Sequence, residues 1–258
     1  MKKQIHVFRI LIILLCLFFV NKEYVYCQNN NDELNKKLLE AVSQGKIEDV
    51  KNLLSKGADV NAKENQFGMT ALISAVYDQQ GEIVRLLLSK GADINAKDNL
   101  GKTALILASY YGYTDMVNIL LSHNLDINLQ DNYGKTALFT SVFKKFNAIA
   151  QALLSKKADP NIKENNGWIA LLVAVDNNDI DIIKLLLANG ANVNSKNNDG
   201  ITALMFAVFK GYGEIVNLLI SEGVDLNLKD NEGNTALTYA KQNNGKEIVE
   251  LLTKSGAK

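Results

Sequence analysis

The sequence predicts an all-α solenoid in which short helix–turn–helix units stack and hairpin-like loops project from one side. Gly-x-Thr-Ala-Leu recurs at a fixed step of 33 residues, and Gly-Ala-Asp-Val-Asn or a variant recurs 21 residues after the Thr position. Between these motifs lie two short apolar segments with helical spacing. Because a helix pair of this size cannot bury its apolar faces alone, the units are expected to stack on one another.

The two motifs set the boundaries of the units. The first motif starts at Gly68, Gly101, Gly134, Gly200 and Gly233, with a degenerate copy, G-W-I-A-L, at Gly167. The second contains Gly57, Gly91, Gly190, Gly223 and Gly256, and its glycine is replaced by Asn124 and Lys157 in two units. Counting back from Gly57 adds one more unit. The sequence therefore predicts seven units, at 34–65, 66–98, 99–131, 132–164, 165–197, 198–230 and 231–258.

The unit at 99–131 illustrates the local pattern. Thr103 to Tyr111 is predicted as a first helix, Gly112-Tyr113 as a break, and Asp115 to Ser122 as a second helix. Asn124 is expected to close that helix with a positive φ, which Gly and Asn tolerate. A turn is expected around 131–134, where short polar side chains bond the backbone.

These motifs resemble the ankyrin repeat family over residues 34–258. The family's Thr-Pro-Leu-His signature appears as Thr-Ala-Leu followed by an apolar residue, namely Ile73, Ile106, Phe139, Leu172 or Met205. Its second-helix signature appears as E-I-V-x-L-L at Glu82 and Glu214. The resemblance implies protein binding on a concave face, without catalysis and without a cofactor. The apolar replacements of the His are expected to add packing between units.

Both ends of the array carry polar residues where inner units are apolar. Asp49 and Asn52 occupy such positions in the first unit, and Thr238, Lys241 and Thr253 do so in the last. Polar outer faces are typical of terminal caps. We therefore expect the seven units to form a complete array.

Residues 1–27 are predicted to be a secretory signal peptide. Lys2, Lys3 and Arg9 precede an apolar run from Ile10 to Val20, which is shorter than the ~20 residues of a membrane span. Cleavage is expected between Cys27 and Gln28, leaving a short polar segment at 28–33. The protein would then be exported, to the periplasm or the extracellular space. The alternative is a membrane anchor formed by an uncleaved 10–20 segment.

Composition excludes several classes of function. The chain has 28 basic and 28 acidic residues; 1–27 holds four basic residues and one acidic residue, so the processed chain would carry 24 and 27. This balance argues against a general nucleic-acid binder. The processed chain would contain no cysteine and a single histidine, His123, which is expected to be a solvated loop residue. We expect no catalytic residues, no metal site and no cofactor.

The function implied by the resemblance is that of a protein-binding scaffold, expected to be a monomer with no membrane contact after processing. An exported effector or inhibitor that blocks one enzyme is the alternative. Candidate binding residues are the apolar side chains that flank the motif glycine or end the first helix of each unit. They are Phe67, Met69, Tyr77, Leu100, Tyr110, Tyr111, Tyr133, Phe143, Trp168, Ile201 and Phe209. The lysines near the loop tips, such as Lys97, Lys163 and Lys196, are expected to be solvated.

The unit at 132–164 departs most from the pattern. Lys145 replaces the glycine between the helices, and Lys157 stands where a positive φ is expected. Pro160 removes a backbone donor from the following turn, and Ile169 replaces the next Thr. We expect this unit to be the least stable of the inner ones.

Overall fold

The structure is a computed structural model that describes residues 31–64, 66–243 and 245–258, and it is an all-α solenoid. The predicted signal peptide therefore lies outside the described residues. Two compact units divide the chain between Asp93 and Ile94. Among the described residues, no helix is long and apolar enough to cross a membrane. The division into seven repeats stays a prediction.

The N-terminal unit consists of a helix over 31–43 followed by three further helices. They are α2 (Ile47–Ser55), α3 (Ala71–Tyr77) and α4 (Gly81–Ser89). Only Val50 of α2 is fully buried, and Asp49 and Asn52 are exposed, as the polar pattern predicts. A loop with an isolated antiparallel bridge between Lys63 and Thr70 leads into α3.

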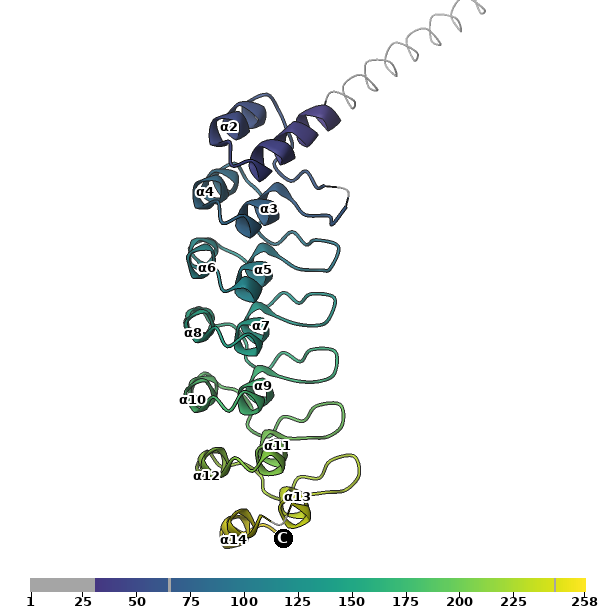
Figure 1. The fold of residues 1–258 in the computed structure, drawn as a ribbon, viewed down its shortest axis with the longest axis vertical. Coiled ribbons are helices and arrows are strands. Elements are labelled where there is room, and N and C mark those ends of the chain that lie inside the picture. The colour runs from purple at the N-terminus through teal and green to yellow at the C-terminus, as the bar shows by residue number, and fades with distance from the viewer. Residues whose placement is uncertain (1–30, 65, 244) are drawn as a thin grey trace, which may run out of the picture. The chain divides into compact units, whose positions relative to one another are not determined.

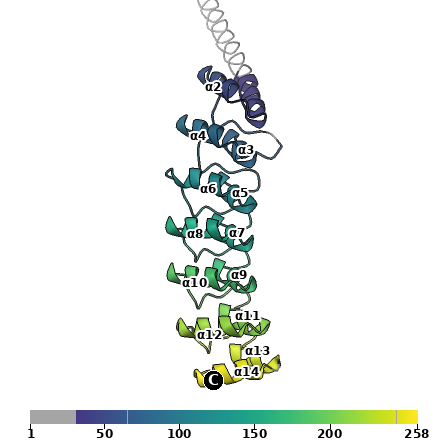
Figure 2. The ribbon, with the colours of Figure 1, turned by 60° about the vertical axis from the view of Figure 1, so that its left-hand side comes forward.

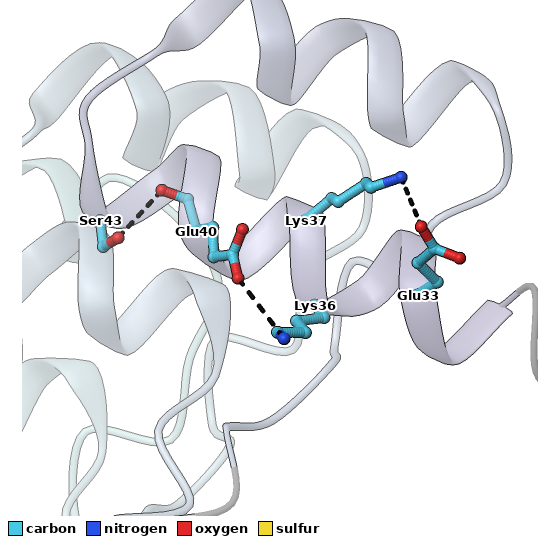
Figure 3. A network of polar contacts seen from close by, with 5 residues as sticks. All are labelled: Glu33, Lys36, Lys37, Glu40 and Ser43. Atoms are coloured by element: carbon cyan, nitrogen blue, oxygen red, sulfur yellow. Dashed lines mark hydrogen bonds and ion pairs between the residues drawn. The ribbon is translucent and has the colours of Figure 1, made fainter.

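Exposed ion pairs run along the first helix (Figure 3). Lys37 donates to Glu33 at 2.7 Å, Lys36 lies 3.9 Å from Glu40, and the Ser43 hydroxyl donates to the Glu40 carbonyl at 2.9 Å. The hydrogen bond and the charge of Lys37 lower the pKa of Glu33. Such exposed i,i+4 pairs keep this face polar and add little stability each.

The C-terminal unit contains five helix pairs in chain order (Figures 1 and 2). The first helices of the pairs are α5 (Ala104–Tyr111), α7 (Ala137–Phe143), α9 (Ala170–Asp176), α11 (Ala203–Lys210) and α13 (Ala236–Gln242). The second helices are α6 (Thr114–Leu121), α8 (Asn147–Ser155), α10 (Ile180–Ala188), α12 (Gly213–Ser221) and α14 (Lys246–Lys254). Loops project beside the first helices, on the side away from the second helices (Figure 1).

The first helices of the C-terminal unit are buried on nearly every side, because each packs on its neighbours and on its own second helix. The apolar residues that replace the family's histidine, such as Ile106, Leu172 and Met205, are at most 1% exposed. Second helices bury one stripe at i and i+3, as at Val117 and Leu120. Each fully buried side chain of this size contributes about 1.5–3 kcal/mol to folding.

The first helices of the C-terminal unit begin directly after the Thr of the repeated motif or the residue that replaces it. Thr103, Thr136, Thr202 and Thr235 cap the first helices by accepting a hydrogen bond from the amide three residues later, at 3.1–3.3 Å. Ile169 begins α9 with no side-chain cap, as expected from the loss of Thr. It is instead fully buried.

The positive φ expected at Lys157 is confirmed, at 67°, and Lys145, which replaces the glycine between the helices, is also left-handed, at 61°. Gln79 and Asn178 adopt the same conformation between the helices of their pairs, so Lys145 is not exceptional. Lys157 is different: among the described residues it is the one non-glycine left-handed at the end of a second helix.

The expectation that Asn124 closes its helix with a positive φ was wrong, because its backbone is not left-handed. The helix α6 ends at Leu121, and the Ser122 hydroxyl donates to the Ile119 carbonyl at 2.7 Å, while Nδ1 of His123 lies 3.0 Å from the same oxygen. The same carbonyl also accepts the Ser122 amide at 3.3 Å. Hydroxyl bonds like that of Ser122 occur at Ser89, Ser155 and Ser221, where a left-handed residue does follow, so the contact of His123 is what distinguishes the end of α6 from these.

Pro160 corrects a second expectation. The equivalent residues Ile127, Val193 and Leu226 donate no backbone hydrogen bond within the described chain. A proline at this position therefore removes no bond that its counterparts make. The departures that remain are Lys157 in this unit and the uncapped start of α9 at Ile169 in the next.

Candidate functional site

The tip of each projecting loop in the C-terminal unit is held by one side chain. In the second of these loops, Oδ1 of Asp131 accepts hydrogen bonds from the amides of Tyr133 and Lys135, both at 2.9 Å. Asp98, Glu164, Asn197 and Asp230 do the same in the other loops. The expected turn role of these residues is confirmed, and they fix the direction in which the tip side chains point.

Neighbouring loops are also bonded to each other. Asn132 donates its side-chain amide to the Asn99 carbonyl at 3.0 Å and its backbone amide to the Leu100 carbonyl at 3.0 Å. The same pair of bonds recurs at Asn165, Asn198 and Asn231. This ladder gives the tips a regular spacing within the unit.

Three of the loop lysines are not simply solvated. The ammonium groups of Lys97, Lys163 and Lys196 each donate at 2.7 Å to a carbonyl 33 residues later, on Gln130, Lys196 and Lys229 respectively. Lys97 and Lys163 are exposed, as expected for solvated side chains, and Lys196 is half-buried. All three join successive loops.

Eight of the candidate residues are the exposed large apolar side chains of the described chain. Phe67, Leu100 and Tyr133 precede the motif glycine, and Tyr77, Tyr110, Tyr111, Phe143 and Phe209 end first helices; their exposed fractions run from 36% to 56%. None of them lies on a second helix. The other three candidates, Met69, Trp168 and Ile201, are half-buried.

Within the N-terminal unit, Met69 and Tyr77 line a hollow of about 990 Å³ with the helix over 31–43. Most of its other lining residues are polar, and burial raises the pKa of Asp78 at its edge.

In the C-terminal unit, lysines lie over the exposed aromatic rings. Lys102 and Lys144 place their Nζ atoms 4.7 Å and 4.1 Å from the ring centroid of Tyr110. Nζ of Lys135 lies 5.0 Å from the ring centroid of Phe143. These are cation–π distances. We call Lys102, Tyr110, Lys135, Phe143 and Lys144 the lysine–aromatic surface.

A hollow of about 230 Å³ adjoins this surface. Its lining includes Lys135, Phe143 and Trp168. The Trp168 ring packs edge-on against Phe206, with the centroids 5.3 Å apart. Asp176, also in the lining, binds Lys210 at 2.9 Å, and this hydrogen bond raises the pKa of Lys210.

The sequence interpretation missed the lysines of this surface and Phe206. A signal for two of them exists: Lys102 and Lys135 follow the motif glycine, in the same position as Met69, Trp168 and Ile201. Lys144 follows the last aromatic residue of its helix. Selecting only apolar side chains at these positions excluded them.

No group of three or more His, Cys, Asp or Glu side chains could hold a metal ion in the part of the chain that the structure describes. His123 is exposed, and its Nδ1 lies against the end of its own helix. The hydrogen bond that the Tyr239 hydroxyl donates to Asp230 raises the pKa of Tyr239 to about 12.

Comparisons with known proteins agree with this architecture. The family model described as Ankyrin repeats (3 copies) matches residues 38–131, 98–164, 125–197 and 171–258. The crystal structure of the ankyrin repeat domain of Bcl-3, described as a unique member of the IkappaB protein family, superimposes with a TM-score of 0.76. That similarity has 30% sequence identity and covers 84% of this chain and 97% of the Bcl-3 chain. No curated protein matches the chain significantly. The fold, its repeated motifs and the family match together show that the chain belongs to the ankyrin repeat family.

Proposed function

We propose that this protein is a non-catalytic scaffold that binds a partner protein through its loop tips and the ends of its first helices, outside the cytoplasm. Ankyrin repeats are generally protein–protein interaction scaffolds. The observation that carries the proposal is the placement of the eight exposed large apolar side chains, all at these two positions. Exposed apolar patches mark interaction sites, and aromatic residues often dominate binding energy.

The export part of the proposal rests on the sequence of residues 1–27, where a basic start, an apolar run and a cleavage motif follow one another. Sequencing the N-terminus of protein recovered from cells tests it. A chain that starts at Gln28 supports export with cleavage. An intact Met1 in the membrane pellet contradicts cleavage and favours the anchor.

The binding part is tested with the partner recovered by affinity capture on the mature chain. Tyr110→Ala, Tyr111→Ala and Phe143→Ala are expected to weaken its binding by about 1–3 kcal/mol at one or more positions. Thermal stability should hardly change, because these side chains are 36%, 43% and 52% exposed. Gln151→Ala, on the exposed face of α8, is the matched control and should leave affinity unchanged. A loss of stability with unchanged binding of the folded fraction would place the binding surface elsewhere.

A further inference from the structure

The lysine–aromatic surface contains three lysines whose ammonium groups form no ion pair within the described part of the chain. The side chains of Lys102, Lys135 and Lys144 are half-buried, with their ammonium groups over Tyr110 and Phe143. Lys210, over the ring of Phe206 at 5.2 Å, differs because Asp176 neutralises it.

The nearby carboxylates are occupied by the loops themselves. Oδ1 of Asp98 and Oδ1 of Asp131 each accept hydrogen bonds from two backbone amides, and Asp131 is only 8% exposed. Both oxygens of the buried Glu164 accept hydrogen bonds within its loop. These acids therefore hold turns in place, while the three ammonium groups remain available to a ligand.

The geometry points to an acidic segment of a partner protein as the ligand of this surface, an inference that rests on the proposed protein-binding function. Carboxylates of the segment pair with Lys102, Lys135 and Lys144, and one of its apolar side chains enters the hollow lined by Phe143 and Trp168. Opposite charges steer such a segment to the surface, and the aromatic rings supply apolar contact.

A nucleic acid fits these observations less well. Its phosphates would need a larger basic surplus, whereas the whole chain has a formal net charge of zero. Glu164 and Asp176 also line the hollow beside Lys135, so the surface is not uniformly basic, as a continuous phosphate backbone would require. A short acidic segment needs only the three lysines as partners.

The test uses the chain as purified from cells and a fluorescein-labelled 12-residue peptide of alternating Glu and Leu. We expect saturable binding that weakens as salt increases, and about tenfold weaker binding of the peptide with Gln in place of Glu. The triple variant Lys102→Gln, Lys135→Gln, Lys144→Gln should lose about tenfold in affinity at an unchanged melting temperature. The control Lys156→Gln, Lys184→Gln, Lys246→Gln removes the same charge from exposed residues near the second helices and should bind like the unmodified protein.

Three results would overturn the inference. They are equal binding of the Glu and Gln peptides, equal losses in the two triple variants, and tighter binding of a labelled oligo-dT than of the Glu peptide. None of these contradicts the proposed function if Tyr110→Ala or Phe143→Ala still weakens binding of the captured partner. In that case the partner is a protein, but it is not recognised through acidic side chains.

Discussion

The backbone amide of Asn165 donates a hydrogen bond to the Tyr133 carbonyl at 3.1 Å, and this bond brings one loop tip directly against Gly134 of the preceding loop. A Cβ atom on Gly134 would lie 2.8 Å from the Asn165 amide nitrogen and 3.0 Å from the Cα of Glu164. Gly134 also has a φ of 76°. Two separate constraints therefore require glycine at this position.

Gly134→Ala is expected to destabilise the protein by about 2–4 kcal/mol, because left-handed strain of about 1–2 kcal/mol adds to a clash with backbone. Gly233→Ala is the matched control: its φ is 87°, but nothing lies within 4 Å of the added Cβ. Urea unfolding of both variants separates the cost of left-handed strain, which both share, from the cost of the clash, which only Gly134→Ala has. Equal losses would mean that contact between the loops contributes nothing.

Lys157→Gly is expected to stabilise the protein by about 1 kcal/mol, because glycine adopts the φ of 67° without strain. Lys156→Gly, at the neighbouring residue with φ −95°, should give no gain, because lysine is unstrained there. Thermal unfolding of the two variants compares them directly. A gain of similar size in both would show that removing charge, not relieving strain, is responsible.

Ser109→Ala is expected to stabilise the protein by about 1 kcal/mol. The Ser109 hydroxyl is fully buried and has no hydrogen-bond partner. No hydrogen bond therefore offsets the free-energy cost of removing the hydroxyl from water. Ser141 provides the control, since its equally buried hydroxyl donates to the Leu138 carbonyl at 2.8 Å. Ser141→Ala should not stabilise. The prediction fails if the unfolding midpoints of both variants move in the same direction by the same amount.

Tyr239→Phe is expected to reduce stability at neutral pH by about 1.5–3 kcal/mol, the typical contribution of a hydrogen bond to a charged group. Burial raises the pKa of Asp230, but hydrogen bonds from the Tyr239 hydroxyl at 2.6 Å, from Asn234 and from the Glu232 amide outweigh it and leave the pKa lowered. A lowered pKa contributes stability above the ordinary carboxyl pKa of about 4, and this is lost as pH falls through the folded value.

The variant should therefore raise the pKa of Asp230, measurable by NMR titration of its carboxyl carbon. The difference in stability between the two proteins should be largest near pH 7 and shrink toward pH 2–3, where the carboxyl is protonated in both. A difference that does not depend on pH would assign the loss to packing of the ring instead.

Native-state hydrogen exchange tests the expected weak unit. Amides in 145–169 should exchange fastest among the inner repeats, because Lys145 and Lys157 are left-handed and Ile169 lacks a capping side chain. Since Pro160 costs no hydrogen bond, Pro160→Ala should leave this pattern unchanged. Uniform protection of the helices from α3 to α12 would contradict the prediction.

The sequence by itself determined the repeated motifs, the approximate helix bounds and the turn at 131–134, because each depends on a few neighbouring residues. It also indicated the left-handed Lys157, but not the left-handed Gln79 and Asn178. The prediction of a positive φ at Asn124 was wrong, because Asn tolerates that conformation but does not require it. A local pattern indicates which conformations a residue tolerates and not which of them it adopts.

Only the tertiary structure decided which side chains meet. Tyr110 lies between Lys102, in the loop before its helix, and Lys144, at the end of the next first helix. Trp168 reaches Phe206 in the unit that follows. The repeat period indicates which positions are equivalent, but the distance between a loop tip and a helix end depends on how neighbouring pairs pack. The exposed aromatics were therefore predictable one by one, whereas the lysines that lie over them, and the charge that results, required the packed fold.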